Sequence, residues 1–425
     1  MKRHLLINWA GVNSGDDFLC EVIVNHLVGI WKDLEISVLS EKPVPAVVRT
    51  IDNASWHPLF PALVSWKAFW RVCAEIWRAD RILIGGGDVV RPEFLSMLPL
   101  LIALVLGKEV SLVGVGVVAP QKAVWRLIYK VALSCVTHAL ARDERSGEVL
   151  RRFSSASVCV GPDLVFAAAN GVNARVAGSE ERDSIVVNLR SVTNPAYLHH
   201  MNVERLDDAA LCETLAQAIS QHVLAHTTRV VLVPMVDDST LADGYSPTES
   251  DLTILNRLRS VICADISVEV VSIRPHSIEQ LNEIYQRAQV VIAMRLHAVI
   301  PALAWAIPVV AIPYASKVGD LRERFPSMHT ISVNDLLNGE TGQVAQIIES
   351  ASGSVPDSAR ARALGVEASR SLDKTLSASD TTDMPRSRSL HIIKRLTSCL
   401  LVSAFALKTG FNRMSAHRQK YAEAA

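Results

Sequence analysis

The stretch VVIAMRLHAVIPALAWAIPVVAIPYASKV, residues 290–318, contains the patterns that decide the fold. Its β-branched start predicts a strand at residues 290–293, which is followed by Met294 and then by Arg295 and His297. Residues 298–306 are compatible with a helix, and the apolar run at 309–312 predicts a second strand. Strand, helix and strand in this order are typical of an α/β unit, in which ligands gather at the carboxyl ends of the strands.

Arg295 and His297 are the polar residues at the end of the first of these strands. An arginine offers a planar fork to a carboxylate or phosphate, and a histidine can carry a proton near neutral pH. The pair therefore suits a small dianion. A structural ion pair of Arg295 with a carboxylate, together with a hydrogen-bonded core histidine, explains the same residues, and this stretch alone leaves both interpretations open.

Strands and helices alternate in this way in two successive halves of the chain, which predicts two Rossmann-like domains with parallel sheets. The first half is predicted to have strands at 4–8, 35–40, 81–84, 110–118, 139–142 and 158–160, and the second at 184–188, 229–233, 267–272, 290–293 and 309–312. Residues 167–183 show no apolar period and are expected to link a domain at 1–166 to a domain at 184–351.

The last part of the chain differs in composition from the rest. Residues 352–385 are rich in Ser, Ala, Thr and Asp, which predicts a flexible linker. Residues 386–425 hold eight Lys or Arg residues and one acid, and are expected to form a basic amphipathic tail. Such a tail could rest on an anionic membrane or pack on the enzyme or a partner, and the sequence favours neither.

Composition excludes several classes of protein. The 425 residues hold 43 Lys and Arg and 43 Asp and Glu. The chain therefore has no net positive charge that would favour binding to nucleic acid. The seven cysteines lack CxxC spacing and are expected to be buried free thiols in a reducing compartment. No stretch reaches the ~18 uncharged apolar residues of a membrane span. We therefore expect a cytoplasmic protein, with at most a peripheral contact at the inner face of the membrane.

Metal and cofactor sites are not expected. The histidines are dispersed, and no group of His, Asp and Glu has ligand spacing along the chain. The turn at residues 11–17 follows the first predicted strand but is neither GxGxxG nor a Walker loop, which disfavours NAD and ATP. Its backbone N–H groups could instead surround an anion or a sugar hydroxyl. Asp16 in this turn is interpreted either as a helix N-cap or as a base acting on an acceptor.

A glycine triplet, Gly85 to Gly87, follows another predicted strand and precedes Asp88. Glycines allow the backbone to approach a ligand or another loop closely, although a tight turn is the alternative explanation. Arg142 and Asp143 are charged residues at the end of an apolar strand, and a structural ion pair is the interpretation that we favour for them.

Five motifs, taken in order, resemble the polysaccharide pyruvyltransferase family. They are Asn13-Ser14-Gly15-Asp16, Gly85-Gly86-Gly87, Arg142-Asp143-Glu144-Arg145-Ser146, Gly161-Pro162-Asp163, and a C-terminal signature formed by Arg295, Leu296, His297, Ala298, Pro308, Tyr314 and Lys317. Each motif is weak alone, but five in this order over about three hundred residues are a specific signal. The resemblance covers roughly residues 4–345.

The resemblance implies a GT-B-like fold with two Rossmann-like halves facing a cleft. It also implies transfer of a pyruvyl group from phosphoenolpyruvate to sugar hydroxyls of an exopolysaccharide or another cell-envelope glycan, with a glycan or lipid-linked oligosaccharide as the partner. Phosphoenolpyruvate is then a co-substrate, and no further cofactor is expected. A histidine typical of the family is absent near Met235, which weakens any acid–base role for that loop.

The expected site residues divide by role. Catalysis is assigned to His297 as the acid, Arg295, and Asp16 as the acceptor-side base. The donor is expected to bind Arg190, Arg295, His297 and Lys317, whereas Asn13, Gly15, Gly86, Gly87 and Asp88 are expected to line the acceptor side. Asp88 is the alternative to Asp16 as the base.

Two other functions remain open at this point. A nucleotide-sugar glycosyltransferase of the same fold would need residues for a diphosphate, for which Glu279 and Arg274 are available without a supporting motif. A non-catalytic protein of polysaccharide assembly, tethered by the basic tail, is the other alternative.

Overall fold

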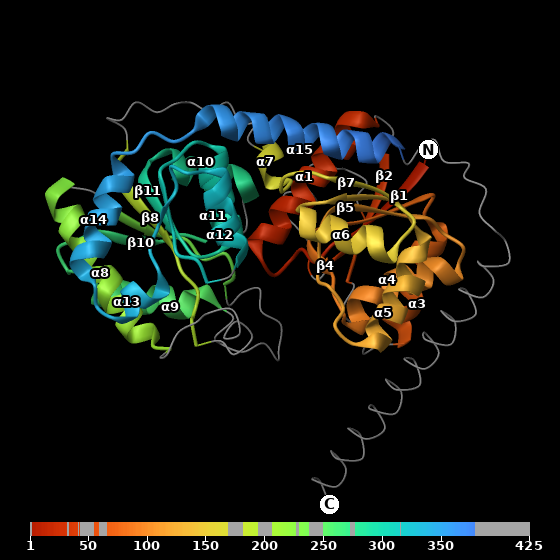
Figure 1. Ribbon diagram of the computed structural model, residues 1–425, viewed down its shortest axis with the longest axis horizontal. Helices are drawn as coiled ribbons and strands as arrows, with labels where there is room; N and C mark the ends of the chain where they lie inside the picture. Colours follow the sequence, from red (N-terminus) through yellow and green to blue (C-terminus); the bar gives the residue numbers. More distant parts are fainter. Residues whose placement is uncertain are drawn as a thin grey trace, which may run out of the picture. The chain divides into compact units, whose positions relative to one another are not determined.

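The computed structural model describes residues 2–31, 34–40, 42, 55–58, 66–168, 182–193, 206–226, 229–237, 250–272, 277–314 and 316–378. These residues form two α/β units, each built on its own parallel sheet (Figure 1). The first unit comprises the described residues within Met1–Ala10, Leu19–Leu164 and Ala368–Ala425, and the second comprises those within Gly11–Phe18 and Val165–Glu367. The predicted pair of Rossmann-like parallel-sheet domains is confirmed.

The first unit contains a seven-stranded parallel sheet in the order β3-β2-β1-β4-β5-β6-β7. Its strands are β1 (Lys2–Ile7), β2 (Leu34–Ser40), β3 (Ser55–Pro58), β4 (Arg81–Val90), β5 (Val110–Val117), β6 (Val136–Ala141) and β7 (Ser157–Val160). Its helices are α1 (Ser14–Ile30), α3 (Trp66–Arg78), α4 (Phe94–Val105), α5 (Ala123–Ala132) and α6 (Glu144–Phe153), with a short 3-10 helix, η2 (Leu133–Cys135). Helices α3, α4 and α5 share one core with the strands. Strand β5 is buried along its whole length, as expected for an apolar strand of a covered parallel sheet.

The second unit contains a six-stranded parallel sheet in the order β10-β9-β8-β11-β12-β13. Its strands are β8 (Ser184–Asn188), β9 (Arg229–Leu232), β10 (Val268–Val270), β11 (Ala288–Ala293), β12 (Val309–Ala311) and β13 (His329–Thr330). Its helices are α7 (Val165–Ala168), α8 (Asp208–His226), α9 (Asp251–Val261), α10 (Ser277–Gln286), α11 (Leu296–Ala304), α12 (Ser316–Arg324), α13 (Val333–Leu337) and α14 (Thr341–Ser352). The predicted strand, helix and strand within residues 290–318 are therefore confirmed as β11, α11 and β12.

The glycine triplet lies inside a strand and not after it. Strand β4 continues to Val90, so the predicted strand end at residue 84 is wrong. Gly86 and Gly87 both have φ of 79°, and the pairing of β4 with β5 shifts register after Gly87. A Cβ on Gly86 would lie 2.9 Å from the Leu19 Cβ. Glycine is thus required here by the backbone conformation and by close packing within the protein.

The flexible linker predicted at 352–385 is also wrong over most of its length, because helix α15 spans Ser358–Ala378. Buried positions recur at helical spacing along it: Ala361, Gly365, Ala368, Leu372, Thr375 and Leu376. Small residues occupy half of this face, so its apolar period was not recognisable from composition. Contacts divide the helix at residue 368 between the two units, which a division of the sequence into consecutive domains does not anticipate.

Several other expectations can be compared with the described residues. None of the six cysteines among these residues forms a disulfide; Cys20, Cys135 and Cys212 are buried, Cys73 and Cys159 are partly buried, and Cys263 is exposed. No helix among these residues has both the length and the apolar character needed to cross a bilayer. Residues 169–181 of the expected interdomain linker and the whole basic tail at 386–425 lie outside the described residues, so the membrane role of the tail remains a prediction.

We predict that Leu372→Ala lowers the free energy of unfolding by about 2–4 kcal/mol, because the fully buried side chain leaves a cavity. Val366→Ala is the matched control, since Val366 lies on the exposed side of the same helix. Chemical denaturation of both variants measures the difference. Equal small losses would contradict the assignment of α15 as part of the packed core.

Candidate functional site

The carboxyl ends of four strands in the second unit carry the polar residues of the candidate site. Arg190 follows β8, Asp237 follows β9, Arg295 follows β11 and Tyr314 follows β12. Because all pairs in this sheet are parallel, these residues lie at one edge of it. The parallel strands therefore bring Arg190, the loop at Met235 and Arg295 to the same edge.

Arg295 forms a buried ion pair with Asp251. Its Nε lies 2.7 Å from Asp251 Oδ2, and its Nη2 lies 2.6 Å from Asp251 Oδ1. The side chain of Asp251 is 1% exposed and that of Arg295 is 11% exposed. The Arg–carboxylate pair considered from the sequence is thus present, and it fixes the orientation of the guanidinium plane.

Asp251 also organises the backbone around this pair, and the sequence analysis did not identify it. Its Oδ2 accepts hydrogen bonds from the backbone N–H groups of Met235 and Val236, at 2.9 and 3.2 Å. Asn188 completes the network: its Nδ2 donates to the Val233 carbonyl at 2.9 Å, and its Oδ1 accepts from Arg295 N at 3.1 Å. The ends of β8, β9 and β11 are therefore fastened together by two buried polar side chains.

The sequence around Asp251 has the pattern of a helix start. Ser250 caps α9 by accepting a hydrogen bond from Leu252 N, and an acid in the first turn of a helix is common. The position of Asp251 in the first turn of a helix is enough to explain an acid there. The contact of its carboxylate with Arg295 is formed only in the folded chain.

Arg190 lies against Tyr314 at the same edge. The guanidinium carbon is 5.0 Å from the centre of the Tyr314 ring, and Nη1 donates to the Tyr314 hydroxyl at 3.4 Å. Arg190 is buried, with 4% of its surface exposed. The aromatic ring therefore holds the arginine by a cation–π contact. Lys317, three residues after Tyr314, lies in α12, and its side chain is outside the described part of the structure.

The loop that precedes α1 belongs by its contacts to the second unit. Asn13 lies immediately before the helix, and its Oδ1 accepts a hydrogen bond from Gly15 N at 3.1 Å. Asp16 lies in the first turn, where its Oδ2 accepts from Asn13 Nδ2 at 3.3 Å. The N-cap is thus Asn13, and the interpretation of Asp16 as the cap is wrong.

Two contacts connect this loop to the edge of the second sheet. Ser14 N donates to the Met235 carbonyl at 2.9 Å. Gly15 approaches His297 so closely that a Cβ on Gly15 would lie 2.5 Å from the His297 Cβ and would overlap the ring. His297 lies in the first turn of α11 and is 8% exposed. The Asn13–Asp16 motif and the Arg295–His297 motif, far apart in sequence, therefore meet.

The other three motifs meet in the first unit around Arg142. Its Nη2 lies 2.5 Å from Asp88 Oδ1, and its Nη1 lies 4.0 Å from Asp163 Oδ2. Asp143 is 3.7 Å from Arg142 Nε and caps α6 by accepting from Ser146 N. The predicted structural ion pair of Arg142 and Asp143 is confirmed, and Asp88 and Asp163 join it.

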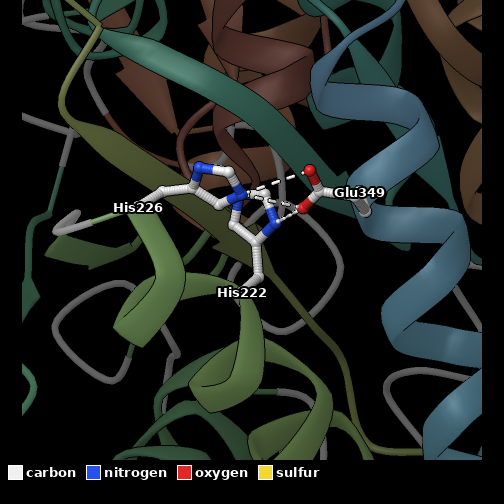
Figure 2. Close-up of side chains that lie close together, drawn as sticks. All are labelled: His222, His226 and Glu349. Carbon is white, nitrogen blue, oxygen red and sulfur yellow. Dashed lines mark hydrogen bonds and ion pairs between the residues drawn. The ribbon is translucent and has the colours of Figure 1, made fainter.

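One group of described residues has the geometry of metal ligands. His222 and His226 on α8 converge with Glu349 on α14, and their donor atoms all lie within 4.8 Å of one another (Figure 2). The expectation of dispersed histidines is therefore wrong for this pair, whose four-residue spacing places both rings on one side of a helix. Of the residues considered for a diphosphate, Glu279 lies exposed in α10 and Arg274 is outside the described residues.

Comparison with solved structures defines the class of protein first. A UDP-GlcNAc 2-epimerase from Methanocaldococcus jannaschii shares 12% identity, with 89% of this chain and 100% of that chain covered and a TM-score of 0.57. A putative UDP-N-acetylglucosamine 2-epimerase from Listeria monocytogenes shares 12% identity over 91% and 99% of the two chains, with a TM-score of 0.57. These likenesses, at such low identity, place the chain among proteins of the GT-B-like fold. No curated protein matches it in sequence.

The family follows from the sequence. The polysaccharide pyruvyl transferase family matches residues 13–316, which include all five motifs apart from Lys317 at the end of the last. The chain belongs to the polysaccharide pyruvyl transferase family. The resemblance inferred from the motifs is thereby confirmed.

We predict that Gly15→Ala destabilises the second unit and reduces activity strongly, because the new methyl group would overlap His297. Gly29→Ala in the same helix is the control, since a Cβ there meets no atom within 4 Å. Thermal unfolding should separate the two variants, with Gly29→Ala neutral or stabilising by about 0.5–1 kcal/mol. Identical behaviour of the two variants would contradict the close approach of Gly15 to His297.

We also predict that Asp251→Asn costs about 3 kcal/mol or more of stability, because it leaves the buried Arg295 charge uncompensated. Asp265→Asn, at an exposed position, should change the free energy of unfolding by less than about 0.5 kcal/mol. Urea unfolding measures both changes. An unchanged stability for Asp251→Asn would show that the pair does not hold the ends of the strands together.

Proposed function

We propose that the chain transfers a pyruvyl group from phosphoenolpyruvate to two hydroxyls of a glycan and so forms a pyruvate ketal. Membership of the polysaccharide pyruvyl transferase family supports the reaction class. The observation that carries the donor site is the gathering of Arg190, Arg295 and His297 at one edge of the second sheet. An exopolysaccharide or a lipid-linked oligosaccharide of the cell envelope is the proposed acceptor.

Phosphoenolpyruvate presents a carboxylate and a phosphate, so its site needs several fixed cations. Arg190, held against Tyr314, and Lys317 in α12 would bind one anionic group. Arg295, whose guanidinium plane is oriented by Asp251 through Nε and Nη2, would bind the other. Asp251 thus has a positioning role in this proposal: it orients the fork before the donor arrives, which lowers the entropic cost of binding.

His297 is the proposed acid. It would protonate the methylene carbon of phosphoenolpyruvate, which leaves an oxocarbenium-like carbon that the first sugar hydroxyl attacks. Cleavage of the C–O bond then releases phosphate, and the second hydroxyl closes the ketal. Two hydroxyl protons are lost overall; one replaces the proton given to carbon, and the other leaves with phosphate.

Asp16 is the proposed base for the acceptor hydroxyl. It lies one residue from Gly15, which contacts His297, so the loop that carries the base also contacts the acid. Asn13 fixes the Asp16 carboxylate by donating to Oδ2. Gly86, Gly87 and Asp88 would contribute to the acceptor side. Because Asp88 accepts a hydrogen bond from Arg142, we assign it an anchoring role and not that of the base.

The test is release of inorganic phosphate from phosphoenolpyruvate in the presence of soluble and lipid-linked glycans. We expect His297→Gln to lose ~10²–10⁴-fold in rate, as for removal of a general acid. Arg190→Lys should also lose activity, since a point charge cannot reproduce the planar contact with Tyr314. Arg287→Ala is the matched control, because Arg287 precedes β11 and lies at the other edge of the same sheet.

If no phosphate is released, either the right acceptor is missing or phosphoenolpyruvate is not the donor. Calorimetry with phosphoenolpyruvate distinguishes these two explanations. Binding by the unaltered protein that weakens in Arg190→Ala supports the donor site even before an acceptor is found. No binding, together with release of UDP from UDP-GlcNAc, would support the glycosyltransferase alternative; a structure of similar fold, the UDP-GlcNAc 2-epimerase of Neisseria meningitidis, is bound to UDP-GlcNAc. Tight binding without turnover on any glycan would favour a non-catalytic protein.

A further inference from the structure

A second polar cluster lies at the opposite edge of the second sheet from the candidate site. His222 and His226 occupy the last part of α8, whose end precedes the start of β9. His222 contacts Gln289 near the start of β11, so the cluster is at the amino ends of the strands. Glu349 reaches it from α14 (Figure 2). None of these residues has a role in the proposed pyruvyl transfer.

The three side chains direct their donor atoms toward a common point. Glu349 Oε2 lies 2.6 Å from His222 Nδ1 and 3.0 Å from His226 Nε2. The two imidazole rings are 4.4 Å apart between centres and tilted by 39°, so they are not simply stacked. Two ligands of a tetrahedral zinc ion with bonds of about 2.0–2.1 Å lie about 3.3 Å apart. Small rotations of the exposed Glu349 side chain would therefore open enough space for a metal ion.

The hydrogen bonds of Gln289 determine which nitrogen of His222 carries a proton. Gln289 Nε2 donates to the Arg182 carbonyl at 3.1 Å, which fixes the amide so that its Oε1 is the atom near His222. That oxygen lies 3.4 Å from His222 Nε2 and can only accept a hydrogen bond. In neutral His222 the proton is thus on Nε2, and Nδ1 presents its lone pair to the Glu349 carboxylate.

A lone pair facing a carboxylate oxygen at 2.6 Å is repulsive unless a cation lies between them. The His222 side chain is only 2% exposed, and Nδ1 is buried without an aligned hydrogen-bond partner despite its closeness to Glu349. A proton between Nδ1 and Glu349 would satisfy only this one contact. A divalent metal ion satisfies both imidazoles and the carboxylate at once.

We propose that His222, His226 and Glu349 bind a divalent transition-metal ion such as zinc, with water as the remaining ligand. Two neutral imidazoles and a carboxylate are a ligand set that suits zinc. Gln289 acts as the outer partner that orients His222, as is common for histidine ligands. The ion would link the end of α8 to α14 and so stabilise the second unit at the edge away from the candidate catalytic residues.

The test uses the full-length protein, freed of metal, and zinc chloride as the probe. Calorimetry should show one tight equivalent of zinc that is lost, or weakened at least about tenfold, in His226→Gln and in Glu349→Gln. Both side chains are largely exposed, so these variants should fold normally without metal. His329→Gln and Glu213→Gln are the controls for loss of a histidine and of a carboxylate elsewhere in the same unit. Both should still bind one tight equivalent of zinc.

Two further measurements identify the ligands. Zinc should raise the Tm of the unaltered protein and of both controls, but not that of His226→Gln or Glu349→Gln, because only a folded site binds the ion. The zinc X-ray absorption spectrum should show imidazole scattering with nitrogen and oxygen neighbours. Equal binding by all variants, or a spectrum dominated by sulfur from the cysteines, would overturn the proposal.

Discussion

The buried carboxylate of Asp251 is the constraint on which the candidate site depends. It holds the fork of Arg295 and accepts backbone N–H groups from the segment after β9, while Asn188 joins the end of β8 to the same network. A buried charge is stable only when it is paired and hydrogen-bonded, so these groups fix one another. The site is therefore rigid before any substrate arrives, and the ends of three strands are held in one arrangement.

Arg295 and His297 belong to one motif but make different contacts in the folded chain. Arg295 compensates a buried acid and caps α11 with its backbone, so part of its role is structural. His297, in the first turn of α11, instead contacts the loop at residues 11–18 through Gly15. A loop from the start of the chain is thus fastened to a helix about 280 residues later. Packing around Gly15 thus brings the two motifs together.

The five motifs do not form one site within either unit. Three of them surround Arg142 in the first unit, where Asp88, Asp143 and Asp163 share its charge. The other two meet in the second unit. This division gives each unit a polar centre of its own, and Gly86 and Gly87 meet a conformational requirement of β4 in addition to the acceptor-side role that we propose for them. The His222–His226–Glu349 cluster adds a third polar centre at the other edge of the second sheet.

The sequence by itself determined the two α/β halves, because alternating apolar strands and amphipathic helices are local patterns, and it determined the family, because the motifs keep their order. It placed Arg190 and Arg295 at the ends of strands, since parallel strands share one edge. It missed Asp251, α15 and the pairing of Glu349 with two histidines. Each of these depends on residues distant in the chain, or on a helix face built from Ala and Gly, and only tertiary packing brings such groups together.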